Sequence, residues 1–117
     1  MPGSLLLNLP VIGIFPNALN FGTEKVGTKS SPLTITVGNP SGTPIAVKKP
    51  TISGADAGDF AESTTCPLAP ATLAPGAKCS IAVTFTPKAS GAREASLKIT
   101  DSAPGSPQLI SLSGTGQ

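Results

Sequence analysis

The sequence predicts an all-β protein built as a sandwich of short strands, and three observations support this fold class. Of the 117 residues, 13 are glycine and 13 are proline, and no run without them is long enough for a convincing helix of ordinary length. Segments of alternating apolar and polar residues recur along the chain between turn residues. Tyr and Trp are absent, so Val, Ile and Leu must form most of the core, with the four Phe residues also expected at core positions.

The strongest strand signal lies between Leu73 and Pro87. A Pro75-Gly76 turn opens it, and every second residue from Cys79 to Phe85 is then apolar. This period of two is typical of a strand with one buried face. Proline has no backbone N–H to donate, so strand pairing is expected to stop at Pro87.

Six weaker signals of the same kind accompany this strand. The first is Ile12–Ile14, which Ala18–Gly22 continues after a kink. The others, in chain order, are Leu33–Val37, Ile45–Ile52, Phe60–Ser63, Ala95–Ile99 and Ile110–Gly114. Ala55–Gly58 is the one place where a short helical turn is expected, with Asp56 as its N-cap. About seven or eight strands at this spacing predict an immunoglobulin-like β-sandwich.

One domain is expected over residues 12–117, preceded by an apolar segment over residues 1–11. Leu5, Leu7, Leu9, Ile12 and Ile14 form an alternating apolar series, which is a candidate for strand exchange with a neighbouring molecule. Packing within its own domain, a linker, a disordered segment and a tag are the other interpretations of this segment.

Composition argues against several classes of function. The net charge is +2 and the basic residues are scattered, whereas nucleic-acid binders concentrate them on one face beside aromatic residues. No apolar run reaches the roughly 18–20 residues of a membrane-spanning helix. The chain has no His and no Gly-x-Ser-x-Gly motif, so neither an enzyme nor a cofactor is predicted, and a small-molecule ligand is disfavoured.

A set of short motifs, in order along the chain, resembles the ASH domain family (abnormal spindle, SPD-2, hydin). The likeness covers about residues 12–116 and is closest to the bacterial relatives called choice-of-anchor D domains. The motifs are Pro16–Gly22, Val26–Thr28, Leu33–Asn39, Ile52–Phe60, Leu73–Pro87, Gly91, Leu97–Asp101 and Leu112–Gly116.

The resemblance implies a sandwich related to the major sperm protein and PapD folds, without shared catalytic residues. It also implies one of two settings, because eukaryotic members belong to ciliary and centrosomal proteins and bacterial members form tandem modules of exported or surface proteins. The expected function is therefore a structural or adhesive protein-interaction module of a bacterial exported protein, with protein partners. A fibre-forming subunit and an intracellular cytoskeletal module are the alternatives.

Cys66 and Cys79 are predicted to form a disulfide, with two free thiols as the alternative. Without His or further Cys the chain cannot assemble the usual four-ligand zinc site, and the spacing is not Cys-x-x-Cys. The pair is also similar to that of bacterial family members. A disulfide implies an oxidising compartment, and hence an extracellular, surface or periplasmic location.

Asp56, Asp59 and Glu62 are the clustered carboxylates of the chain. They are predicted to belong to a capped turn, where Asp56 and Asp59 lie near free backbone N–H groups. Oxygen ligation of a hard cation is the functional alternative, although the spacing is not that of an EF-hand. Lys48-Lys49 is interpreted as a solvated strand end, with contact to an acidic partner as its alternative.

Overall fold

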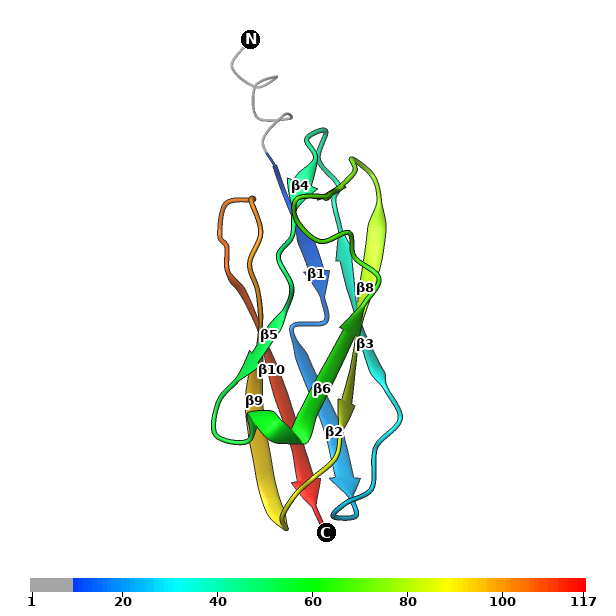
Figure 1. The fold of residues 1–117 in the computed structure, drawn as a ribbon, viewed down its shortest axis with the longest axis vertical. Coiled ribbons are helices and arrows are strands. Elements are labelled where there is room, and N and C mark those ends of the chain that lie inside the picture. The colour runs from blue at the N-terminus through cyan, green and yellow to red at the C-terminus, as the bar shows by residue number, and fades with distance from the viewer. Residues whose placement is uncertain (1–9) are drawn as a thin grey trace.

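The computed structural model describes residues 10–117, which form an all-β protein with one short 3₁₀ turn (Figure 1). Its elements are β1 (Gly13–Phe15), β2 (Ala18–Glu24), β3 (Leu33–Gly38), β4 (Ile45–Ala46), β5 (Thr51–Ser53), η1 (Ala57–Asp59), β6 (Phe60–Thr64), β7 (Thr72–Leu73), β8 (Lys78–Phe85), β9 (Gly91–Ile99) and β10 (Gln108–Gly116).

Two four-stranded sheets make the sandwich. The first has the order β1-β3-β8-β6, and the second has the order β2-β10-β9-β5. Figure 1 shows the two sheets running along the same long direction, so that the described chain begins near one end and the C-terminus lies at the other. The predicted immunoglobulin-like sandwich is confirmed.

β8 lies inside the first sheet and pairs antiparallel with β3 on one side and β6 on the other. Its inward residues from Cys79 to Phe85 are buried, while the residues between them are partly exposed. The strand ends at Phe85, two residues before Pro87, as the missing proline donor predicts.

The first two strands are one chain segment divided between the two sheets. β1 pairs antiparallel with β3, whereas β2 pairs parallel with β10 in the opposite sheet. The chain changes sheet at Pro16-Asn17, between the two strands. The expected kink is therefore a crossing from one layer to the other, which closes one side of the sandwich.

The strand expected over Ile45–Ile52 is instead two short strands. β4 pairs with β7, a two-residue strand that the sequence pattern did not indicate, and β5 pairs with β9. Between them Val47 makes a single bridge to Asp101, and Pro50, which lacks a backbone donor, stands just before β5. These divisions raise the strand segments above the seven or eight expected.

The core fills the space between the two sheets and is mainly aliphatic. Ile35, Val83, Leu97 and Leu112 are among its fully buried members, drawn from both layers. The rings of Phe21, Phe60 and Phe85 form a cluster with centroid separations of 5.0–5.8 Å. Contact between rings at this distance adds to the free energy gained from burying their area.

Candidate interaction surface at the first strand

β1 is the exposed edge of the first sheet, and apolar side chains are present on both of its faces. Ile12 and Ile14 are partly buried and pack against the core. Val11 and Phe15, which alternate with them, are 50% and 76% exposed. The expectation that all four Phe residues lie in the core is therefore wrong for Phe15, because it alternates with the inward Ile14 and lies on the outer face of the strand.

A shallow groove of about 580 Å³ runs over the outer face of the sheet beside Phe15. Its floor includes Gly13 and Gly38, which are directly opposite each other on β1 and β3. Pro40, Ala77 and Lys78 contribute to its lining, so the groove is mostly apolar with one cation. A cross-strand glycine pair leaves the face of a sheet hollow, because neither residue has a side chain.

The candidate strand-exchange residues fall partly within this surface. Ile12 and Ile14 lie at or beside β1, on the edge of the first sheet. Leu5, Leu7 and Leu9 lie outside the described residues. Exchange through this segment therefore stays a prediction.

The two cysteines form a disulfide in the structure, with an S–S distance of 2.02 Å. The bond joins the loop after β6 to the second residue of β8, and both residues are buried. Nearby, Thr65 and Ser80 also connect the two segments, since the Ser80 N–H donates to Thr65 Oγ1 at 3.0 Å. The disulfide therefore fastens the loop after β6 to the start of β8.

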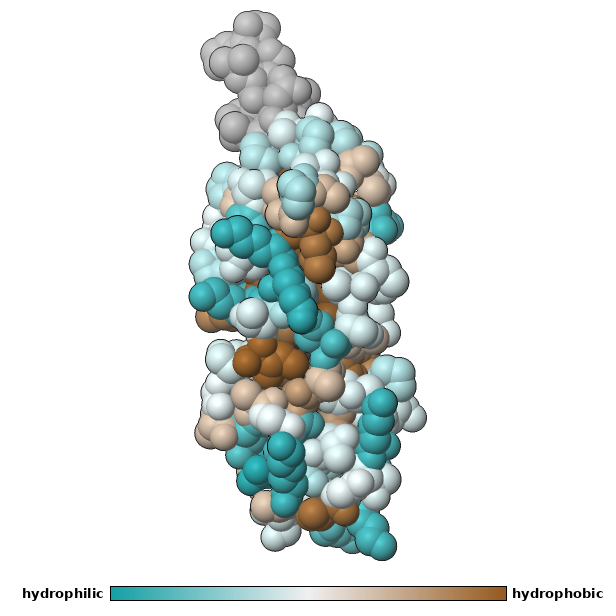
Figure 2. Space-filling model, viewed as in Figure 1, coloured by the Kyte–Doolittle hydropathy of each residue, from teal (hydrophilic) through white to brown (hydrophobic). Residues whose placement is uncertain are grey.

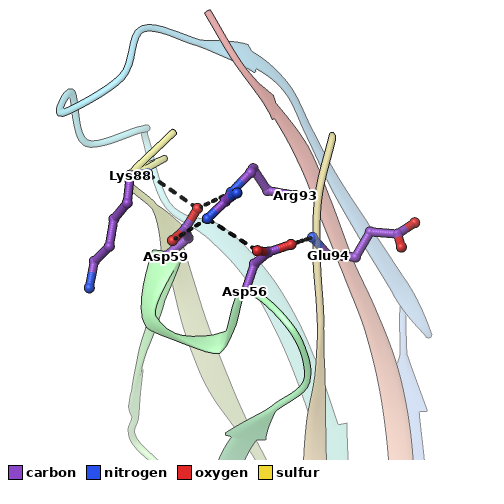
Figure 3. Close-up of polar contacts among 5 residues, drawn as sticks. All are labelled: Asp56, Asp59, Lys88, Arg93 and Glu94. Carbon is purple, nitrogen blue, oxygen red and sulfur yellow. Dashed lines mark hydrogen bonds and ion pairs between the residues drawn. The ribbon is translucent and has the colours of Figure 1, made fainter. Parts of the chain in front are cut away.

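The carboxylates of Asp56 and Asp59 bind Arg93 of β9 (Figure 3). Arg93 Nε donates to Asp59 Oδ2 at 2.7 Å, and Nη2 lies 3.1 Å from Asp56 Oδ1. The Lys88 N–H donates to Asp59 at 3.2 Å, and the Glu94 N–H donates to Asp56 at 2.9 Å. This cluster ties the η1 turn, from which both aspartates come, to the second sheet.

The predicted capped turn is thus wrong in one respect. Asp56 occupies the N-cap position of η1, but its side chain makes no capping hydrogen bond. A guanidinium group binds a carboxylate through its positive charge as well as through hydrogen bonds. Arg93 is close enough to form an ion pair with both Asp56 and Asp59. The turn is held by β9 and not by a cap of its own.

The hydrogen bond from Arg93 lowers the pKa of Asp59, and the Lys88 N–H acts in the same direction against the opposing effect of burial. Asp59 is nearly fully buried, so its charge is kept by these donors. Elsewhere, burial raises the pKa of Asp101, whose Oδ1 accepts a hydrogen bond from the Ala103 N–H in the β9–β10 connection. Asp59 thus binds the Arg93 side chain and a backbone N–H, whereas Asp101 binds the backbone of its own connection.

Residues 10–117 contain few side-chain groups that could serve catalysis or bind a metal. Within residues 10–117, no three His, Cys, Asp or Glu side chains come together in a way that could hold a metal ion. None of the helices described in that range is long and apolar enough to cross a membrane. Glu62 lies on β6, apart from the Arg93 cluster, and Lys48 and Lys49 are exposed between β4 and β5.

Solved structures with this fold come from bacteria and from eukaryotes. A protein of unknown function from Porphyromonas gingivalis W83 matches with a TM-score of 0.73 and 13% identity, over 93% of this chain and 48% of its own. The ASH/PapD-like domain 7 of human CEP192 matches with a TM-score of 0.66 and 17% identity, over 91% of this chain and 84% of its own. At these identities the likeness shows the fold alone.

The secreted serine protease VesC from Vibrio cholerae also contains the fold, with a TM-score of 0.62 and 14% identity, over 93% of this chain and 23% of its own. The chain thus spans about half of the Porphyromonas protein and a smaller part of the protease. Among curated protein sequences, none matches the chain.

These matches show that the fold is an immunoglobulin-like β-sandwich, similar to the domain of CEP192 that is described as ASH/PapD-like. The sequence profile of the ASH family (abnormal spindle-like microcephaly-associated, ASPM-SPD-2-Hydin) matches residues 13–109. The chain belongs to this family, as its motifs predicted. Membership indicates a protein-interaction module.

Proposed function

We propose that the chain is a non-catalytic structural or adhesive module of a larger bacterial exported or surface protein, of the choice-of-anchor D type. The observation that carries the interaction role is the open edge of β1, where Val11 and Phe15 are exposed beside an apolar groove. Large apolar side chains exposed together at a sheet edge are typical of protein-binding surfaces.

The shape of the sandwich supports a role as one unit of a string. The described chain begins near one end and finishes at the opposite end (Figure 1). Sandwiches with this arrangement can follow one another in line without a long connection between them. On the face that Figure 2 shows, apolar residues form small separate areas among polar ones. Such a surface suits a spacer.

The export part of the proposal rests on the disulfide. Buried disulfides persist in oxidising compartments and are rare in the cytosol. The similar fold inside the secreted protease VesC is a bacterial precedent for a sandwich of this kind within an exported protein.

Thiol titration of denatured protein taken from its native source tests this setting. We expect no free thiol before reduction and two after it, because both cysteines of the chain are in the disulfide. Two free thiols before reduction would contradict export and favour an intracellular cytoskeletal module. Protein made and purified with a thiol-blocking agent present serves as the control against oxidation during isolation.

A fibre-forming subunit is the second proposal, and the same open edge favours it. Leu5, Leu7 and Leu9 of one copy would add to β1 of the next, and each addition would leave another open edge. Such an assembly grows with concentration without a fixed size, which distinguishes it from a closed oligomer.

A further inference from the structure

Gly13 and Gly38 are glycines that the fold of a single copy does not require. Neither has a positive φ, and a Cβ on Gly13 would come no closer than 3.9 Å to any neighbour, the Gly38 carbonyl oxygen. On Gly38 the nearest atom would be the flexible Lys78 side chain at 3.6 Å. Gly114 contrasts with both, because a Cβ there would lie 2.5 Å from the ring of Phe85.

Glycine inside a strand weakens it, and often marks a place where another backbone or a ligand comes close. The groove over Gly13 and Gly38 is such a place, and it extends from β1 across β3 to the start of β8. On its other side, β1 has no pairing partner among residues 10–117. Between Pro10 and Pro16 the segment has no charged residue and no polar side chain. The edge of β1 is therefore suited to an uncharged, apolar strand.

β1 and its flanking residues are complementary to themselves. The segment Val11-Ile12-Gly13-Ile14-Phe15 is nearly symmetric about Gly13, because an Ile flanks the glycine on each side and a large apolar residue follows at each end. Two antiparallel copies centred on Gly13 therefore place Ile12 opposite Ile14, and Val11 opposite Phe15, on matching faces. A two-fold interface needs this property, because each residue contacts the residue that contacts it in return.

We infer that two copies of this chain pair through their β1 edges, antiparallel, about a two-fold axis at Gly13. The pairing joins the two first sheets into one continuous sheet. Pro10 and Pro16, which lack backbone donors, limit it to the five residues between them. This pairing rests on the proposed role as an interaction module, and it gives that module a second copy of the chain as its partner.

The outer face of this interface accounts for both exposed side chains. Val11 of each copy lies directly across from Phe15 of the other, so neither remains in water. Phe15 is also diagonal to Gly13 of the second copy, within reach of an aromatic ring, and covers the hollow that the glycine leaves. On the inner face, Ile12 and Ile14 extend the core across the boundary.

Analytical ultracentrifugation of the full chain over a dilution series tests the pairing. We expect a reversible monomer–dimer equilibrium that does not proceed to larger species, because the two-fold contact uses up both edges. The Val11→Lys/Phe15→Lys variant places like charges opposite each other and should be monomeric at every concentration. Leu109→Lys is the matched control, since Leu109 is 64% exposed on β10, and it should dimerise as the native chain does.

Charge exchange then tests the register. The Val11→Glu/Phe15→Glu variant should also be monomeric alone, but an equimolar mixture with the Val11→Lys/Phe15→Lys variant should form a heterodimer, because Lys and Glu then face each other at both positions. Circular dichroism and the melting midpoint of each variant must match those of the native chain, as the exposure of both residues predicts. Failure of the mixture to associate would overturn this register.

A cross-link tests the axis directly. Opposite residues of an antiparallel pair have Cα atoms about 4.5–5.5 Å apart, which a disulfide can span. Gly13→Cys should therefore give a covalent dimer under mild oxidation. Gly42 is exposed on a loop, where an added Cβ would have no atom within 4 Å, and Gly42→Cys should give far less covalent dimer.

Three results would overturn the inference. The first is a native chain that stays monomeric at all concentrations while its disulfide is intact; this would leave the proposed module role standing. The second is association that Val11→Lys/Phe15→Lys does not change. The third is association that Leu5→Lys/Leu7→Lys abolishes and that grows without limit, which would favour exchange of the N-terminal segment. Free thiols in native-source protein would contradict the proposed export without affecting the pairing.

Discussion

β8 and β1 belong to the same sheet but differ in how many strands they pair with and in how much of their apolar surface is buried. β8 is paired on both sides, and its inward residues Ile81, Val83 and Phe85 have no exposed surface. β1 is paired on one side and leaves Phe15 mostly exposed, with a glycine at its start. The inward side chains of β8 are buried within this copy, whereas on β1 Ile14 packs against the core and Phe15 is left exposed.

The difference shows how stability and recognition are divided along one sheet. Burial in the centre of the sheet supplies folding free energy at about 25 cal/mol per Å² of apolar area. An exposed edge contributes little of this, but it presents backbone groups and apolar side chains to another strand. Four predictions test the division, from the largest expected effect to the smallest.

Val83→Asp should unfold the domain, because it buries an unpaired charge in the middle of β8. We expect the loss to exceed about 4 kcal/mol, whereas Phe15→Asp on β1 should change the free energy of unfolding by less than about 0.5 kcal/mol. Urea denaturation at low protein concentration measures both. A folded Val83→Asp variant with native stability would contradict the inward orientation of β8.

Removing the disulfide should cost about 3 kcal/mol, since the bond closes a short loop onto the start of β8. The Cys66→Ala/Cys79→Ala variant should keep its circular dichroism spectrum and melt at a lower temperature. Reductant should lower the melting midpoint of the native chain and leave that of the variant unchanged. Equal midpoints for the two oxidised proteins would show that the bond contributes nothing to stability.

Gly114→Ala and Gly13→Ala should have opposite effects. The first forces a methyl group against the Phe85 ring and should destabilise the domain by about 1–3 kcal/mol. The second has room for the methyl group and should be neutral, or stabilise by up to about 1 kcal/mol, because it restricts the unfolded chain. Equal losses at the two positions would mean that β1 is packed as tightly as the centre.

Asp59→Asn should destabilise the chain in a way that depends on pH. Asp59 contacts Arg93, and its carbonyl oxygen accepts from the Thr86 N–H just after β8. Because its pKa is lowered in the folded state, the charged form stabilises the fold above the ordinary value of 3.8, and this contribution is lost as pH falls through the folded pKa.

The unfolding free energies of native and Asp59→Asn proteins should therefore differ at neutral pH and converge in acid, as a denaturation series against pH would measure. Glu24→Gln, which removes a carboxylate far along the chain from this cluster, is the control for net charge. A difference that stays constant down to the lowest pH at which both proteins fold would exclude the ionic contact as its cause.

Much of the fold follows from local pattern. The alternation from Cys79 to Phe85 and the stop before Pro87 appear in the structure as predicted. The division of Ile45–Ile52 into β4 and β5 was missed, because their separate partners, β7 and β9, are distant in sequence. The three-residue β1 was recognised, but not that β2 continues it in the other sheet.

The site was harder to predict than the fold. Asp56 and Asp59 were identified, yet their partner Arg93 lies more than thirty residues later, with no local signal that it would turn toward them. The groove was also missed, because it depends on Gly13 and Gly38 lying opposite each other on two strands, which the pattern along either strand does not show. The cross-strand position of Gly13 would have been the signal, had the register been known.

By itself, the sequence determined where most of the longer strands lie, which of their faces is apolar and where β8 ends, because side-chain alternation and the missing proline donor act over a few residues. Tertiary structure decided which strands lie at an edge, which glycines face each other and which carboxylates receive Arg93. Those outcomes depend on register and on contacts between distant segments, where a shift of one residue exchanges the two faces of a strand.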